Sequence, residues 1–244
     1  MIKAFIVFLI MGSFSFGQMI NYHSIEDEKV MGYLSKPKSK GPFPGIILIH
    51  EWWGLNQDIK NKADEFAKKG YIALAVDLYQ GNNTSEPNIA RKLAGNVRGN
   101  IDEAFKNLKS GLDYLKKINE VDPQKLAAIG WCFGGGWSYQ IAKNNLGVKA
   151  SVIYYGRFNP DDDLSIMRSN IIGHFAENDR GISIDNVKEF QAKLKTHKGY
   201  HEIYIYPNTM HGFASRPGEN SIYNKNASDK AWKRTIRFLD KTLN

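Results

Sequence analysis

The sequence predicts an α/β fold, with a mostly parallel central sheet and helices on both faces. Short apolar runs alternate with amphipathic segments along most of the chain, and this order is typical of strands and helices that alternate. The runs are continuously apolar, as in strands that are buried on both faces. The chain has 244 residues, of which 42% are hydrophobic and 24% charged, and no linker divides it. We therefore expect one globular domain.

The first 17 residues read as a signal peptide. They combine a basic start at Lys3, a short apolar run and small residues before a cleavage site ahead of Gln18. The apolar run is shorter than the roughly 20 residues that a membrane helix needs. We expect cleavage and export to the periplasm or medium, which leaves residues 18–244 as the domain without a stable membrane anchor. An uncleaved, membrane-tethered form is the alternative.

The elements expected in the first half follow from their patterns in turn. A polar stretch with intermittent apolar residues predicts an edge strand or hairpin, continuous apolar runs predict buried strands, and apolar residues at helical spacing predict helices. The hairpin falls at 21–34, the strands at 46–49 and 71–76, and the helices at 58–69, 88–96 and 101–117. Glycines at 95 and 99 interrupt the pattern of the second helix.

The second half repeats the alternation. Strands are expected at 127–132, 148–155, 171–176 and 201–206, and helices at 135–145, 187–194 and 227–243. Polar residues follow several of the strands directly. Loops at the carboxyl edge of an open α/β sheet are where such folds bind ligands, so we expect the functional site there.

The only cysteine, Cys132, lies in a glycine-rich turn between a strand and a helix. Its pattern Gly130-Trp131-Cys132-Phe133-Gly134 repeats the G-x-S-x-G nucleophile elbow with sulfur in place of oxygen. Glycine suits both ends because a side chain would collide across so tight a turn. We interpret Cys132 as a nucleophile; a small buried cysteine beside a bend is the alternative. A lone thiol forms no internal disulfide, which gives weak further support.

A thiol nucleophile needs a base, and His211 has the best setting of the six histidines. It lies in a loop shortly after the strand at 201–206, and Asp179 follows the preceding strand. Glu177 and Asp185 are alternatives for the acid. The order Cys132, Asp179, His211 matches the nucleophile–acid–base order of α/β-hydrolases. We therefore expect the three side chains to meet at one edge of the sheet.

Several separate motifs resemble the dienelactone hydrolase family, a branch of the α/β-hydrolase fold whose nucleophile is cysteine. The resemblance covers about residues 22–244 and rests on IHEWWG at 49–54, DLY at 77–79, GWCFGG at 130–135, ND at 178–179 and HGFA at 211–214. It implies a triad of Cys132, His211 and Asp179. It also implies that Glu51 lies near the sulfur as a fourth catalytic residue, for which a loop carboxylate facing water is the alternative.

Further site residues follow from this resemblance. The backbone N–H groups of Phe133 and of Trp52, in the turn after Glu51, are expected to form the oxyanion hole. Trp53 either lines the pocket or only packs the loop. Members of the family that act on dienelactone hold its carboxylate with arginines; here Arg216 lies one residue later than expected, and the second is Arg91 or Arg98. The resemblance therefore implies the fold and the triad, but it does not imply that dienelactone is the substrate.

The sequence predicts a hydrolase that cleaves an ester or lactone through a thioester on Cys132, without cofactor or metal. A peptidase of the same fold and a non-catalytic binding module are the alternatives. A metal site at His197 and His201 is disfavoured, because the residues between them suggest a turn into a strand. The formal charge of +8, or +7 without the leader, comes from lysines scattered among acidic residues. This pattern suggests no nucleic-acid groove, and the surplus can attract an anionic substrate. A monomer or small homo-oligomer is expected.

Overall fold

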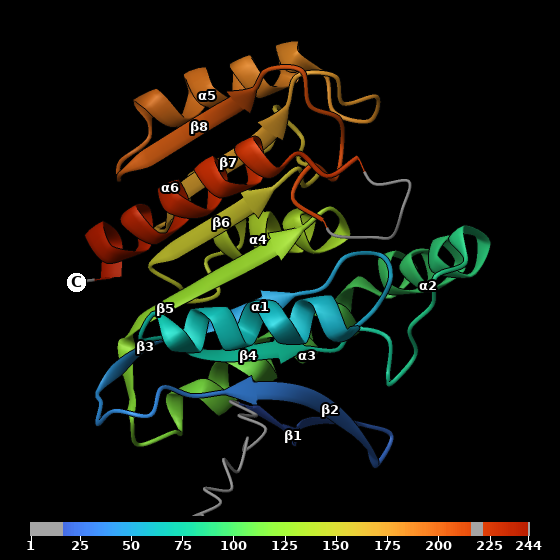
Figure 1. Cartoon of the computed structure of the whole chain (residues 1–244), viewed down its shortest axis with the longest axis vertical. Coiled ribbons are helices and arrows are strands. Elements are labelled where there is room, and N and C mark those ends of the chain that lie inside the picture. Colours follow the sequence, from blue (N-terminus) through green and yellow to red (C-terminus); the bar gives the residue numbers. More distant parts are fainter. Residues whose placement is uncertain (1–16, 216–221, 244) are drawn as a thin grey trace, which may run out of the picture.

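The computed structural model describes residues 17–215 and 222–243, which form one eight-stranded sheet with helices on both faces (Figure 1). The strands lie in the order β1-β2-β4-β3-β5-β6-β7-β8. β1 pairs antiparallel with β2, and β2 with β4, whereas the other neighbours are parallel. The strands are β1 (Gly17–Ile25), β2 (Glu28–Ser35), β3 (Phe43–Ile49), β4 (Ile72–Val76), β5 (Val121–Trp131), β6 (Ala150–Tyr154), β7 (Asn170–Ala176) and β8 (His201–Tyr206). The predicted α/β class is confirmed.

Six helices cover the sheet or flank it in the described part of the chain. They are α1 (Gln57–Lys68), α2 (Pro87–Gly99), α3 (Ile101–Lys116), α4 (Phe133–Lys143), α5 (Ile184–Thr196) and α6 (Lys225–Leu243). α1 and α6 cover one face, while α3, α4 and α5 cover the other, and α2 projects from the body (Figure 1). The four residues Ile46, Ile47, Leu48 and Ile49 of β3 are fully buried between these layers, as their continuous apolar run predicts.

Some helices and strands begin or end at other residues than the sequence predicts, because strand pairing or the local turn extends them. The hairpin begins at Gly17, which pairs with Ser35. β5 begins at Val121, because Phe43 of β3 pairs with it before the register shifts. α2 continues through Gly95 to Gly99. Gly95 lies on the exposed side of the helix, where no side chain is needed for packing. The predicted leader lies outside the described residues except for its last residue, Gly17.

The carboxyl ends of the central parallel strands lie at one edge of the sheet. Glu51 follows β3, Cys132 follows β5, Tyr155 follows β6 and Asp179 follows β7. The topology thus brings chemically active side chains from four loops together, as expected for an open α/β sheet.

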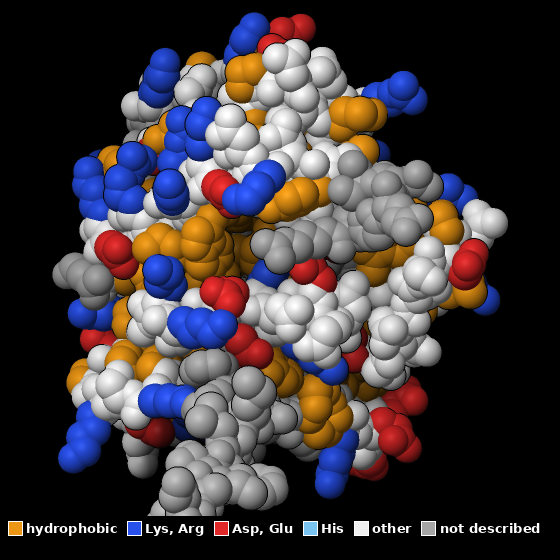
Figure 2. All heavy atoms as spheres, in the orientation of Figure 1, with side chains coloured by type: hydrophobic (Ala, Val, Ile, Leu, Met, Phe, Trp, Pro, Cys, Tyr) orange, Lys and Arg blue, Asp and Glu red, His pale blue; other side chains and the backbone are white. Residues whose placement is uncertain are grey.

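On the face that Figure 2 shows, basic side chains gather over α6. Over the rest of that face, acidic and basic side chains are mixed. On α6 several bases have partners: Arg237 pairs with Glu202 at 2.6 Å, and Arg234 lies 3.8 Å from the ring centroid of Tyr204. In residues 17–215 and 222–243, no helix has the length and apolarity required to cross a bilayer.

Candidate active site

Cys132 stands between the last residue of β5 and the first residue of α4, in a strained conformation. Its φ of 53° and ψ of −112° lie where residues other than glycine are rare. A Cβ on Gly130 would lie 1.9 Å from the carbonyl oxygen of Gly134, and a Cβ on Gly134 would lie 2.2 Å from that of Ile49. Only glycine fits at either position. The elbow geometry predicted from the sequence is therefore present.

His211 connects the sulfur to Asp179. Its Nε2 lies 3.0 Å from Sγ of Cys132, and its Nδ1 lies 2.7 Å from Oδ2 of Asp179. The Asp179 side chain is 1% exposed, and its other oxygen accepts hydrogen bonds from the backbone N–H groups of Gly181 and Ile182, at 2.8 and 3.2 Å. The carboxylate is therefore fixed, and it orients the imidazole.

Neither alternative acid takes the place of Asp179 beside the imidazole. Glu177 accepts a hydrogen bond from the backbone N–H of Asn208 at 2.8 Å, and Asp185 lies in the first turn of α5. The structure thus brings together the three residues that the chain order predicts.

The electrostatic surroundings of His211 favour its protonated form. Burial opposes protonation, but the hydrogen bonds and charges of Asp179 and Cys132 outweigh it and raise the pKa of His211 from 6.5 to about 10. An imidazolium beside the sulfur stabilises a thiolate. The 37% exposure of the His211 side chain leaves it accessible from the pocket.

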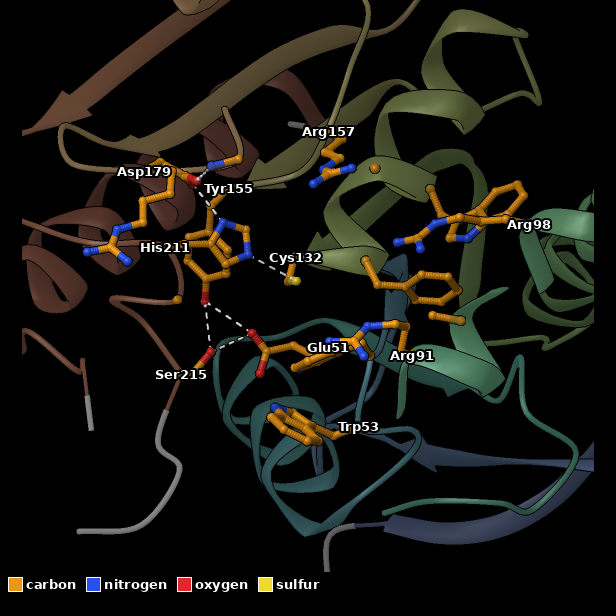
Figure 3. Close-up of a pocket in the computed structure, with 18 of the residues that line it drawn as sticks. Glu51, Trp53, Arg91, Arg98, Cys132, Tyr155, Arg157, Asp179, His211 and Ser215 are labelled. Carbon is orange, nitrogen blue, oxygen red and sulfur yellow. Dashed lines mark hydrogen bonds and ion pairs between the residues drawn. The ribbon is translucent and has the colours of Figure 1, made fainter. Parts of the chain in front are cut away.

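Glu51 is buried, and so it is not a loop carboxylate facing water. Ser215 donates a hydrogen bond to its Oε1, and the Tyr155 hydroxyl, at 3.4 Å, donates to the same oxygen. Burial raises the pKa of Glu51, although the charge of Lys62 and the Ser215 hydrogen bond act in the opposite direction. The carboxyl group lies close to the Cys132–His211 pair, as Figure 3 shows.

A pocket of about 820 Å³ opens over Cys132. Trp53 lines it, which favours the first of its two alternatives, and both candidates for the second arginine, Arg91 and Arg98, line it as well. Arg216 lies outside the described residues. The sequence reasoning missed Arg157 and Arg180, which line the same pocket and come shortly after the ends of β6 and β7. Their position at the carboxyl edge of the sheet was the available signal.

The backbone on either side of the sulfur offers N–H donors. Phe133 is the first residue of α4, and the N–H groups of a first helical turn have no acceptor within the helix. Trp52 lies in a turn that the Gly54 N–H closes by donating to the Glu51 carbonyl at 3.2 Å. Both residues line the pocket, which is the position that an oxyanion hole requires.

His197 and His201 lie side by side, with ring centroids 5.5 Å apart. Both ring nitrogens of His197 lie within 3.0 Å of backbone carbonyl oxygens, and Nδ1 of His201 accepts from the Ile171 N–H at 3.1 Å. Within the described ranges, no three His, Cys, Asp or Glu side chains are grouped as a metal would require.

The sheet, its helices and the nucleophile elbow define an α/β-hydrolase fold. A model of the dienelactone hydrolase family matches residues 30–243, and the chain therefore belongs to the dienelactone hydrolase family. Its class is that of the carboxylic ester and lactone hydrolases.

The chain is also similar to individual proteins. The chain is 31% identical over 233 residues to protein usf of Aquifex pyrophilus, covering 93% of this chain and 99% of the relative. It is 27% identical to a putative carboxymethylenebutenolidase of Methylorubrum extorquens, covering 86% of this chain and 76% of that protein. A solved dienelactone hydrolase-like promiscuous phosphotriesterase from metagenomic libraries shares the fold with a TM-score of 0.82 at 21% identity, covering 93% and 98% of the two chains.

Proposed function

We propose that the chain hydrolyses a carboxylic ester or lactone through nucleophilic attack by the Cys132 thiolate. The observation that carries the proposal is the pair of contacts of His211, 3.0 Å to the sulfur and 2.7 Å to Asp179. A nucleophile, a base within hydrogen-bond reach and a third group that orients the base are the requirements of covalent catalysis.

In the first half-reaction, the sulfur adds to the carbonyl carbon of the substrate. The negative charge that develops on the carbonyl oxygen is held by the N–H groups of Phe133 and Trp52. The imidazolium of His211 then gives its Nε2 proton to the leaving oxygen as the carbon–oxygen bond breaks. The products of this step are an alcohol, or the freed hydroxyl of an opened lactone, and an acyl thioester on Cys132.

In the second half-reaction, neutral His211 takes a proton from water, and the resulting hydroxide adds to the thioester carbonyl. The carbon–sulfur bond breaks, the acyl group leaves as the carboxylic acid, and the thiolate is restored beside the imidazolium. Asp179 holds the imidazole in one tautomer throughout. Burial raises the pKa of Glu51 and so acts against a second negative charge beside the thiolate.

A substrate panel combined with thiol alkylation tests the proposal. We expect turnover of aryl esters and lactones by the wild type, loss of turnover in Cys132→Ala, and inactivation by iodoacetamide in step with alkylation of Cys132. Cleavage of peptides in preference to esters would instead indicate a peptidase. Binding without turnover, with no effect of iodoacetamide, would indicate a binding module.

Export is proposed from the composition of residues 1–17. The mass of the protein recovered from the extracellular or periplasmic fraction tests it: a chain that begins at Gln18 supports cleavage and export. An intact amino terminus in the membrane fraction would support the tethered form.

A further inference from the structure

We propose that the pocket takes a dianionic ester, with one negative group in the leaving part against Arg157 and the other in the acyl part against Arg91 and Arg98. This inference rests on the proposed function, because it names the substrate class of the same site.

Among the described residues that line the pocket, positive charges outnumber negative ones. The arginines among them are Arg91, Arg98, Arg157 and Arg180. The carboxyl groups among its described lining residues are Asp179 and Glu51, and neither pairs with an arginine. Asp179 is held by His211 and by two backbone N–H groups. Glu51 accepts from Ser215 and Tyr155, and burial raises its pKa. Within the described part of the chain, neither carboxyl group of the pocket neutralises these arginines, and their charges can bind a ligand.

Arg157 is fixed close to the nucleophile by glycine packing. A Cβ on Gly136 would lie 3.3 Å from the carbonyl oxygen of Arg157, and a Cβ on Gly156 would lie 2.1 Å from the carbonyl carbon of Gly135. The backbone that leads into Arg157 therefore packs directly on the first turn of α4, which begins beside Cys132.

The guanidinium of Arg157 lies beside the loop that carries Asp179. A Cβ on Gly181 would lie 3.4 Å from Nη2 of Arg157 and 3.5 Å from Oδ1 of Asp179. In the proposed reaction His211 protonates the leaving oxygen, so the leaving group lies on the side of His211 and Asp179. Arg157 is therefore placed to bind a negative charge on the leaving group.

The other two arginines come from α2, across Cys132 from His211. Figure 3 shows Arg91 and Arg98 reaching toward Cys132 from that side, while Arg157 reaches toward it from the β6 side. The Arg98 guanidinium lies 5.5 Å from the ring centroid of Phe133, the residue after the nucleophile. These arginines are placed to bind a negative charge on the acyl part.

The same pocket also has apolar walls. Trp53, Phe105 and Trp137 line it, and the ring centroids of Phe105 and Trp137 are 5.6 Å apart. A substrate with an apolar or aromatic part and two carboxylates fits these lining residues, because guanidinium groups bind planar carboxylates through two parallel hydrogen bonds.

A panel of four aryl esters tests the effect of each negative charge separately. The leaving group is 4-carboxyphenol or its neutral amide, and the acyl group is an adipate half-ester or its neutral amide. In the wild type we expect each carboxylate to raise kcat/KM by about tenfold. Arg157→Gln should remove the advantage of the leaving-group carboxylate alone, and Arg98→Gln that of the acyl carboxylate alone. Lys188→Gln removes an exposed charge on α5 and should leave both rate advantages unchanged. Equal rates for all four esters would overturn the inference, as would loss of both advantages in Arg157→Gln.

Binding measured without chemistry keeps this test separate from the proposed function. Four analogues, in which an amide bond replaces the ester bond that would be cleaved, are titrated calorimetrically into Cys132→Ala and into the double variant Cys132→Ala with Arg157→Gln. Roughly hundredfold tighter binding of the dianion than of the uncharged analogue, reduced by Arg157→Gln, supports the inference even if no ester acylates the wild type. Equal binding of all four analogues contradicts it even if the esters are hydrolysed.

Discussion

The Cβ that Gly130 lacks would lie 1.9 Å from the carbonyl oxygen of Gly134. This approach closes the turn in which Cys132 takes its positive φ, and it sets the direction of the sulfur toward His211. The strained residue is thus held by its neighbours, as is common at functional sites.

Gly130→Ala should therefore distort the elbow. We expect a loss of kcat/KM of about 100-fold or more, because a shift of about 1 Å at the nucleophile has that effect. We also expect destabilisation of about 1–3 kcal/mol from overpacking. Steady-state kinetics and urea unfolding measure both. Gly95→Ala is the control: no atom lies within 4 Å of the added Cβ, and alanine in helix α2 should stabilise by about 0.5–1 kcal/mol. Similar behaviour of the two variants would contradict the account.

Asp179→Asn should lower the pKa of His211, because the hydrogen bond and charge of Asp179 help to raise that pKa to about 10. We expect a fall in kcat of about 100-fold or more, since the imidazole loses its orienting carboxylate. Titration of His211 by NMR in both proteins measures the pKa. An unchanged pKa would show that Asp179 does not act on His211.

The same shift makes stability depend on pH with a defined sign. The pKa of His211 is higher in the folded protein than the reference of 6.5, so proton binding stabilises the fold fully below about pH 6.5 and this contribution is lost as pH rises to about 10. The difference in unfolding free energy between wild type and His211→Gln should therefore shrink across this range. A difference that grows with pH would contradict the assignment.

Glu51→Gln is expected to stabilise the protein at pH 8. The pKa of Glu51 is raised by burial, so its ionisation at high pH acts against the folded state, whereas glutamine stays neutral. Urea unfolding at pH 8 and at pH 4 tests this, and the advantage of the variant should disappear at pH 4. Destabilisation that is larger at pH 8 than at pH 4 would show that the carboxylate form is the one held.

His174 provides a test away from the site. It is fully buried, with Nδ1 2.9 Å from the Tyr206 hydroxyl and Nε2 2.9 Å from Oγ1 of Thr235, and burial lowers its pKa to about 3. Its neutral form contributes stability above about pH 6.5 that is lost as pH falls toward 3. His174→Phe should cost about 1–3 kcal/mol at pH 7, and less at pH 4. A constant difference between these pH values would contradict this account.

The sequence was sufficient for features that depend on local pattern and chain order. Continuous apolar runs located the central strands, and the spacing of Gly130 and Gly134 around Cys132 located the elbow. Asp179 and His211 were found because each follows a strand. α4 begins at Phe133, two residues before the predicted start, because the elbow turns directly into the helix.

Contacts between distant segments had no local signal. Tyr155 ends an apolar run and reads as part of a strand, yet its hydroxyl lies 3.2 Å from Oγ of Ser215 and 3.4 Å from Glu51. Arg157 is one of many scattered basic residues, and only the packing of Gly156 on α4 brings it to the pocket. Such placements depend on tertiary structure.

The most direct test of the central claim is the intact mass of the protein during reaction with a slowly hydrolysed aryl ester. We predict one added acyl group, located on Cys132 by peptide mapping, formed and lost at rates consistent with turnover and absent in Cys132→Ala. Turnover without an adduct, or an adduct of equal extent in Cys132→Ala, would contradict the account.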